Sequence, residues 1–157
     1  MAPSKPGDQS GRDPDRVARL SAAIDQAVRD TGLPIVAVWL HGSWATTHQR
    51  ADSDLDLGFL GARPLSWIER GDFVTGLAGV LGETQDIDAV DLLSADSVFA
   101  ALAVSSGERV FSVGDAAQRF EIRALAGYAR LNEERGEILR DIFERGTIRR
   151  QDTVAER

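Results

Sequence analysis

Cysteine is absent from this chain of 157 residues, which excludes disulfide bonds and thiolate metal sites. Long hydrophobic runs are absent too, since no apolar stretch approaches the roughly 20 residues of a membrane-spanning helix. Residues 1–13 are polar and rich in proline, glycine and serine, so they lack the apolar core of a secretory signal. We therefore expect a cytoplasmic protein that makes no contact with a membrane.

Basic residues are scarce in the middle of the chain. Lysine occurs once, and residues 52–115 hold twelve acidic and three basic residues. Proteins that grip nucleic acid depend on lysine and arginine contacts to phosphate, so direct DNA binding is not expected. An acidic centre instead suits a site that collects divalent cations.

The composition is that of an ordinary globular protein, with 43% hydrophobic and 27% charged residues. The length fits one domain with one core. We predict a disordered tail over residues 1–12, a single domain over residues 13–145, and a polar C-terminal tail over residues 146–157.

Helical and strand patterns alternate within the predicted domain, which indicates a compact α/β (α+β) fold. Asp13 and Pro14 are typical of a helix N-cap and first position, and Thr31-Gly32 of its end. The strands are predicted over residues 35–40, 54–60, 86–92 and 108–111. Helices are predicted over residues 14–31 and 115–143, with a short helix over 44–47. A helix of about four turns is predicted to begin at Ser66. Another is predicted to begin at Ser94 or Asp96 and to end at about Ser105.

The helix that begins at Ser66 is predicted from its start rather than from its interior. Ser66 and Glu69 have the spacing of a capping box. The interior contains Gly71, Gly76 and Gly79, which weaken a helix unless close packing requires them.

The most informative stretch is Gly42-Ser43, followed after ten residues by Asp54-Leu55-Asp56. Asp54 and Asp56 are two apart on a predicted strand, so their carboxylates share one face, about 6.5 Å apart along the chain. Leu55 would point the other way, into the core. Two such carboxylates repel each other unless a cation or a proton lies between them, and Mg²⁺ is a natural partner.

Gly42 and Ser43 follow a buried strand at a tight turn. A strand that turns at a glycine into a helix presents free backbone N–H groups to a phosphate. Gly42 permits close approach and Ser43 adds a hydroxyl donor. A triphosphate would then lie between this turn and a pair of metal ions, which can stabilise both the attacking and the leaving oxygen.

A third carboxylate is expected from the next strand, where Asp86, Asp88 and Asp91 are candidates. Asp86 and Asp88 share one face, and Asp91 lies on the other. We favour Asp88, which is central in the strand, as the third metal ligand. It could also accept the proton of an incoming hydroxyl.

The pattern Gly42-Ser43-X10-Asp54-X-Asp56 resembles the signature of the polymerase-β-like nucleotidyltransferase superfamily, in its minimal nucleotidyltransferase (MNT) branch. The segment Ile87 to Leu92 is similar to the family's third-aspartate strand. Gly107 to Phe111, followed by a long helix, also resembles the family's C-terminal portion. The likeness spans residues 16–145.

The resemblance implies a small mixed sheet flanked by helices, with a long C-terminal helix. It implies catalysis by Asp54, Asp56 and Asp88, which would hold two Mg²⁺ ions, and binding of ATP by Gly42, Ser43, Asp54 and Asp56. It further implies an antitoxin that transfers AMP from ATP onto a tyrosine of a partner HEPN-domain ribonuclease toxin.

One departure and several alternatives accompany the resemblance. The family often has arginine after Gly-Ser, where this chain has Trp44; Arg50 is a possible substitute as a phosphate contact. His41 and His48 are more typical of structural or exposed histidines than of catalytic ones. Two alternative functions remain open. The chain could be a non-catalytic antitoxin that acts by binding the toxin, or it could transfer a nucleotide to a small molecule or RNA.

Overall fold

The order of helices and strands agrees with the pattern expected from the sequence. The computed structural model describes residues 13–42, 54–82 and 86–145, apart from a few side chains near the C-terminal end of the last helix. Within these residues the elements are α1 (Pro14–Thr31), β1 (Ile35–His41), β2 (Leu55–Gly61), α2 (Trp67–Leu81), β3 (Ile87–Asp91), α3 (Ser97–Ser106), β4 (Glu108–Ser112) and α4 (Ala116–Arg145). The short helix expected over 44–47 lies outside the described residues, as do both predicted tails.

The helix starts follow from their capping residues. The Asp13 carboxylate accepts backbone N–H groups of the first turn of α1, with Pro14 at the first position. Ser66 and Glu69 form the expected capping box of α2. Asp96 is the N-cap of α3, accepting the N–H of Phe99, which settles the choice that the sequence leaves between Asp96 and Ser94.

The four strands form one mixed sheet in the order β3-β2-β1-β4. β1 pairs antiparallel with both β2 and β4, whereas β2 pairs parallel with β3. Because β2 and β3 are parallel, their N-terminal ends lie at the same end of the sheet, where the predicted carboxylates lie.

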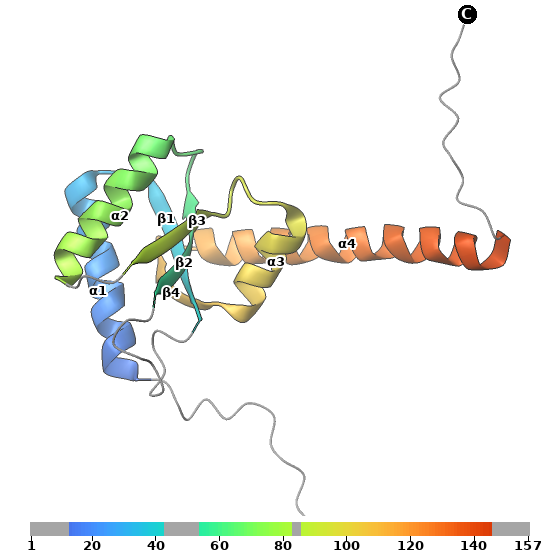
Figure 1. The fold of residues 1–157 in the computed structure, drawn as a ribbon, viewed down its shortest axis with the longest axis horizontal. Coiled ribbons are helices and arrows are strands. Elements are labelled where there is room, and N and C mark those ends of the chain that lie inside the picture. The colour runs from blue at the N-terminus through green and yellow to red at the C-terminus, as the bar shows by residue number, and fades with distance from the viewer. Residues whose placement is uncertain (1–12, 43–53, 83–85, 146–157) are drawn as a thin grey trace, which may run out of the picture.

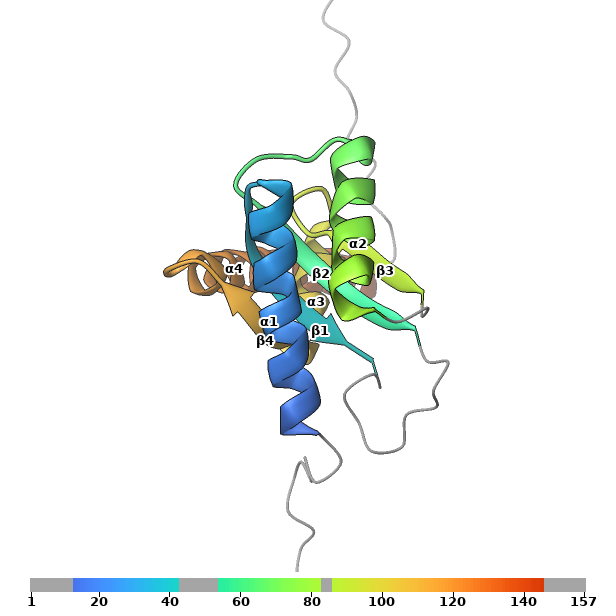
Figure 2. The same ribbon diagram turned by 90° about the vertical axis from the view of Figure 1, so that its left-hand side faces the viewer.

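Helices cover both faces of the sheet (Figures 1 and 2). α1 and α2 lie side by side on one face, over a core that includes Leu20, Leu57 and Phe73. α3 and the first part of α4 cover the other face, over a second core that includes Trp39 and Phe120. This face is the one onto which Asp56 and Asp88 project.

α4 extends well beyond the sheet (Figure 1). Its first turns are anchored by buried Ala117 and Phe120, whereas Ile138 and Leu139 near its far end are more than half exposed. The apolar stripe of this helix is therefore buried only where the sheet lies beneath it. None of the described helices is long and apolar enough to span a membrane.

Candidate active site

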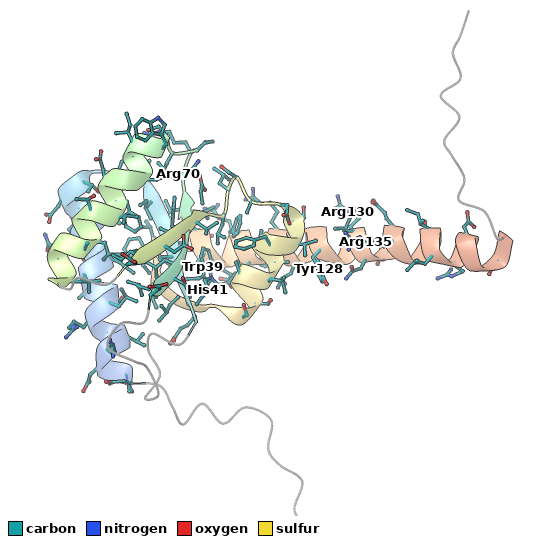
Figure 3. All side chains as sticks on the ribbon, viewed as in Figure 1. Trp39, His41, Arg70, Tyr128, Arg130 and Arg135 are labelled. Carbon is teal, nitrogen blue, oxygen red and sulfur yellow. The ribbon has the colours of Figure 1, made fainter. Side chains whose placement is uncertain are left out.

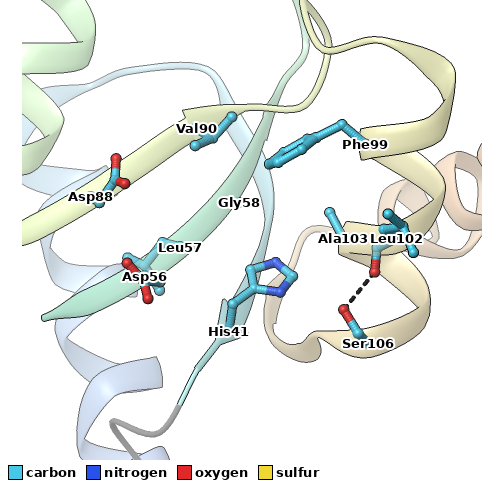
Figure 4. Close-up of a pocket in the computed structure, with 10 residues that line it drawn as sticks. All are labelled: His41, Asp56, Leu57, Gly58, Asp88, Val90, Phe99, Leu102, Ala103 and Ser106. Carbon is cyan, nitrogen blue, oxygen red and sulfur yellow. Dashed lines mark hydrogen bonds between the residues drawn. The ribbon is translucent and has the colours of Figure 1, made fainter. Parts of the chain in front are cut away.

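Three polar side chains form a row across the sheet because of the strand register. His41 of β1 is paired with Asp56 of β2, and Asp56 is paired with Asp88 of β3. Neighbouring strands lie about 4.8 Å apart, and paired residues project from the same face. The register therefore places the imidazole and the two carboxylates next to one another, as Figure 4 shows.

Asp54 lies immediately before β2 and is exposed. It is two residues from Asp56, so strand alternation directs both to the same side. The intervening Leu55 is fully buried on the opposite side, in the core beneath α1 and α2. The structure thus brings Asp54, Asp56 and Asp88 to one end of the sheet, on the face of α3.

The charges at this end act on Asp56. Its pKa is raised above the ordinary 3.8, first by burial and then by the negative charges of Asp88 and Asp54, while His41 opposes the rise. Three carboxylates this close together form a site of negative potential. Such a site attracts cations, and its oxygen ligands are those that Mg²⁺ prefers.

The carboxylates approach one another without closing around a metal ion. Within the described ranges, no three histidine, aspartate or glutamate side chains are grouped closely enough to hold one. The donor set nevertheless fits Mg²⁺, because the partly buried Asp56 is flanked by two more carboxylates, those of Asp54 and Asp88.

Gly42 follows His41 at the end of β1, in a backbone conformation with φ of 72° that favours glycine. A Cβ atom at this position would lie 3.0 Å from Oδ2 of Asp56. The glycine therefore gives the turn its direction and leaves room for the carboxylate. Ser43, with Trp44, His48 and Arg50, lies outside the described residues.

The other two aspartates near β3 differ from Asp88 in their surroundings. Asp91 is buried on the opposite face, where its carboxylate accepts the N–H of Leu93 and the hydroxyl of Ser94. Asp86 is exposed and precedes the strand. Asp91 is thus a strand-end residue, as its position in the sequence indicates, and Asp88 is the one that lines a cavity with Asp56.

The cavity lies between the carboxylates and α3 and has a volume of about 310 Å³. His41, Asp56 and Asp88 form its polar side. Phe99 and Leu102 of α3 form an apolar wall opposite (Figure 4). This combination of apolar walls with a few convergent polar groups is typical of small-molecule sites.

His41 is the cavity residue that sequence reasoning set aside as structural or exposed. Burial lowers the pKa of its imidazole, partly offset by Asp56. Its ring packs so closely on the turn after α3 that a Cβ at Gly107 would lie 2.5 Å from its Cε1 atom. Strand alternation with buried Trp39 was the available signal, since it places both side chains on the same face of β1.

A network next to the site ties α4 to the sheet. The indole N–H of Trp39 donates to Glu121 at 3.0 Å, and Arg109 of β4 pairs with the same carboxylate. Although partial burial raises the pKa of Glu121, the hydrogen bonds from Arg109 and Trp39 lower it overall. Sequence reasoning places Trp39 in the core, which is confirmed, but it does not single out Arg109 or Glu121.

Comparison with known proteins shows that this chain is similar to a family of nucleotidyltransferases. The sequence profile described as polymerase beta, nucleotidyltransferase matches residues 24–115, which contain the whole sheet and all three carboxylates. The protein adenylyltransferase MntA of Shewanella oneidensis is 29% identical over 120 residues, covering 76% of this chain and 85% of that protein.

Solved structures with a similar fold include toxin–antitoxin complexes. One, of a toxin–antitoxin with AMP-PNP, matches with a TM-score of 0.62 and 28% identity, covering 78% of this chain and 98% of the matched chain. Another, of tri-AMPylated Shewanella oneidensis HEPN toxin in complex with MNT antitoxin, matches with a TM-score of 0.60 and 27% identity, covering 81% and 98%.

Proposed function

Because the chain belongs to the polymerase beta nucleotidyltransferase family, we propose that it transfers AMP from ATP to a tyrosine of a HEPN-domain ribonuclease toxin and so acts as an antitoxin. The observation on which this rests is the register that aligns Asp56 with Asp88 beside Asp54. The similarity to a protein adenylyltransferase supports the choice of a protein acceptor.

The reaction needs positioning and charge neutralisation more than covalent chemistry from the protein. The phenol oxygen of the acceptor forms a bond to the α-phosphorus of ATP, the bond from that phosphorus to the bridging oxygen breaks, and pyrophosphate leaves. Asp88 receives the phenol proton, since it is exposed and lines the cavity, whereas the carboxylate of Asp91 is held by the N–H of Leu93 and the hydroxyl of Ser94.

The three carboxylates would hold Mg²⁺, with Asp54 and Asp56 contributing from one strand and Asp88 from the next. When bound, Mg²⁺ neutralises phosphate charge and orients the phosphates. Gly42 and Ser43 would contact the phosphates from the end of β1. Gly42 suits this role because its glycine backbone permits close approach. Since ATP is an abundant cytoplasmic metabolite, the reaction would take place in the cytoplasm.

The projecting part of α4 supports a protein partner rather than a small acceptor. It extends past the sheet, and Ile138 and Leu139 are exposed there. Arg130 and Arg135 lie on the same helix, along its middle (Figure 3). Exposed apolar side chains beside charged ones are typical of surfaces that meet another protein.

The proposal is tested by incubating the full chain with its partner toxin, Mg²⁺ and ATP labelled in the α-phosphate. We expect label on the toxin and loss of ribonuclease activity, both abolished by EDTA and restored by Mg²⁺. Asp54→Asn is the matched control, since it removes one exposed carboxylate and is expected to transfer no label.

Neutralisation of the toxin without transferred label would overturn the proposal and favour an antitoxin that acts by binding alone. Label found on RNA or on a small molecule, with none on the toxin, would also overturn it and identify a different acceptor class.

A further inference from the structure

One polar atom of the cavity has no role in the function proposed above. Nε2 of His41 is buried from solvent and has no hydrogen-bond partner among the described residues. Buried polar atoms in folded proteins nearly always have a partner, so an unpaired one beside a cavity is suited to bond a molecule held there. In Figure 4 the imidazole lies between the carboxylates and α3, on the inner side of the cavity.

The surfaces around His41 fit a flat apolar ring. Val90 of β3 and Phe99, Leu102 and Ala103 of α3 line the cavity. Its volume of about 310 Å³ falls at the small end of the range for ligand pockets. Aromatic rings prefer such surroundings, where their faces contact apolar side chains and their edges meet a polar group.

Gly58 also lines the cavity, at a position where a side chain would meet the buried Leu92. Gly58 of β2 follows Asp56 on the same face of the strand, where most residues would project a side chain. A Cβ atom there would lie 3.1 Å from Cδ1 of Leu92. The packing of Leu92 accounts for this glycine, and as a result bare backbone of β2 lines the cavity between the carboxylates and the apolar wall.

We propose that this cavity receives the nucleobase of the bound nucleoside triphosphate, and that Nε2 of His41 hydrogen-bonds to the edge of the base. The inference rests on the proposed function, which places the triphosphate at the neighbouring carboxylates. It adds a specificity pocket formed by His41, Gly58, Val90, Phe99 and Leu102.

The acceptor tyrosine is the other ring that the reaction brings to this site, and its chemistry fits less well. The only polar atom of a phenol ring is its oxygen, which must lie at Asp88 and the phosphorus to react. A phenol therefore has no atom left for His41. A nucleobase has nitrogen atoms around its ring, so it can pair with His41 while its phosphates reach the carboxylates.

The test compares two ligands that differ in the base. The affinities of AMP-PNP and of inorganic tripolyphosphate are measured by calorimetry in Mg²⁺, for the native chain and for His41→Phe, which keeps a ring but has no nitrogen. We expect His41→Phe to weaken AMP-PNP about tenfold, since the edge of the base loses its partner, and to leave tripolyphosphate unchanged.

A second pair of variants tests the pocket independently, in case His41→Phe does not fold. Leu102 is 56% exposed on α3, so Leu102→Ala should keep the fold, and we expect it to weaken AMP-PNP but not tripolyphosphate. The matched control is Ile122→Ala on α4, which is 62% exposed and lies away from the cavity. It should change neither affinity.

Unchanged AMP-PNP affinity in Leu102→Ala and in folded His41→Phe would overturn the base pocket. Equal weakening of both ligands would overturn it too, because the effect would then lie at the phosphates. A raised KM for the toxin at unchanged nucleotide affinity would assign the cavity to the acceptor instead. Failure of the native chain to bind AMP-PNP would contradict the proposed function as well as the base pocket. Binding of AMP-PNP that does not depend on His41 or Leu102 would contradict the base pocket alone.

Discussion

The pKa of Asp56 is raised by burial and by the neighbouring carboxylates of Asp88 and Asp54, and it is lowered by the imidazole of His41. We expect Asp56→Asn to abolish transfer, because a neutral amide is a poor ligand for Mg²⁺. The same change removes carboxylate repulsion, so the metal-free variant should be as stable as the native chain or more stable. Urea unfolding in EDTA measures the free energy of unfolding, and loss of folding in the variant would count against the site.

The stability difference should depend on pH with a definite sign. A raised pKa means that folded Asp56 binds its proton more tightly than unfolded Asp56, with its ordinary value of 3.8. The native chain therefore loses stability as pH rises from 3.8 through the folded pKa, and Asp56→Asn does not. The advantage of the variant should be small near pH 4 and larger at pH 7. An advantage that shrinks as pH rises would refute this explanation.

Asp88 and Asp91 are three residues apart and should respond to substitution in opposite ways. Asp91→Ala leaves the N–H of Leu93 and the hydroxyl of Ser94 without an acceptor, which should cost about 2 kcal/mol of unfolding free energy. Asp88→Asn should leave stability nearly unchanged and abolish transfer. Thermal unfolding and the labelled-toxin assay measure the two effects, and exchanged outcomes would show that the third ligand is misassigned.

At the scale of the element, glycines that look alike in the sequence differ in what surrounds them. A Cβ at Gly107 would lie 2.6 Å from the carbonyl oxygen of Ala103 and closer still to the ring of His41. A Cβ at Gly79, on the exposed side of α2, would meet nothing within 4 Å. Only the first glycine is therefore required by its neighbours.

We expect Gly107→Ala to lower the free energy of unfolding by about 2 kcal/mol, since the backbone at the end of α3 must shift. Gly79→Ala is the matched control, and it should raise stability by about 0.5–1 kcal/mol because alanine favours a helix interior. Urea unfolding compares both with the native chain. A Gly107→Ala variant as stable as Gly79→Ala would contradict the close packing of His41.

The elements themselves were largely predictable, because their signals are local. Asp13 and Pro14 begin α1, and the capping box of Ser66 and Glu69 begins α2, as expected. The glycines of α2 were ambiguous in the sequence. The structure shows that Gly76 packs against Thr31, where a Cβ would lie 3.1 Å from Cγ2, whereas Gly71 has open space.

At the scale of the whole molecule, the site depends on pairings that no local pattern contains. The alternation of Asp54 and Asp56 was visible in the sequence, and so was an acidic strand after α2. The alignment of Asp56 with Asp88, and of His41 with Asp56, follows from the strand order β3-β2-β1-β4. That order is set by long-range packing of α1 and α2 on one face and α3 and α4 on the other.

The cavity wall has the same origin. Phe99 and Leu102 read in the sequence as apolar positions of a short helix, and only the placement of α3 over the end of β1 turns them toward the carboxylates. The position of His41 beside the carboxylates could not be predicted for the same reason, since Asp56, with which it pairs, is separated from it in the chain. The face of the sheet that bears the polar row is thus also the face on which this cavity lies.

The central claim is that Asp54, Asp56 and Asp88 together hold the cations that receive the nucleotide. Crystals grown with AMP-PNP and Mn²⁺ in place of Mg²⁺ test it through anomalous diffraction. We predict Mn²⁺ peaks in contact with all three carboxylates and with the phosphates, on the side of the sheet that faces α3. A bound nucleotide whose phosphates lie away from these carboxylates, with no Mn²⁺ between them, would contradict the account.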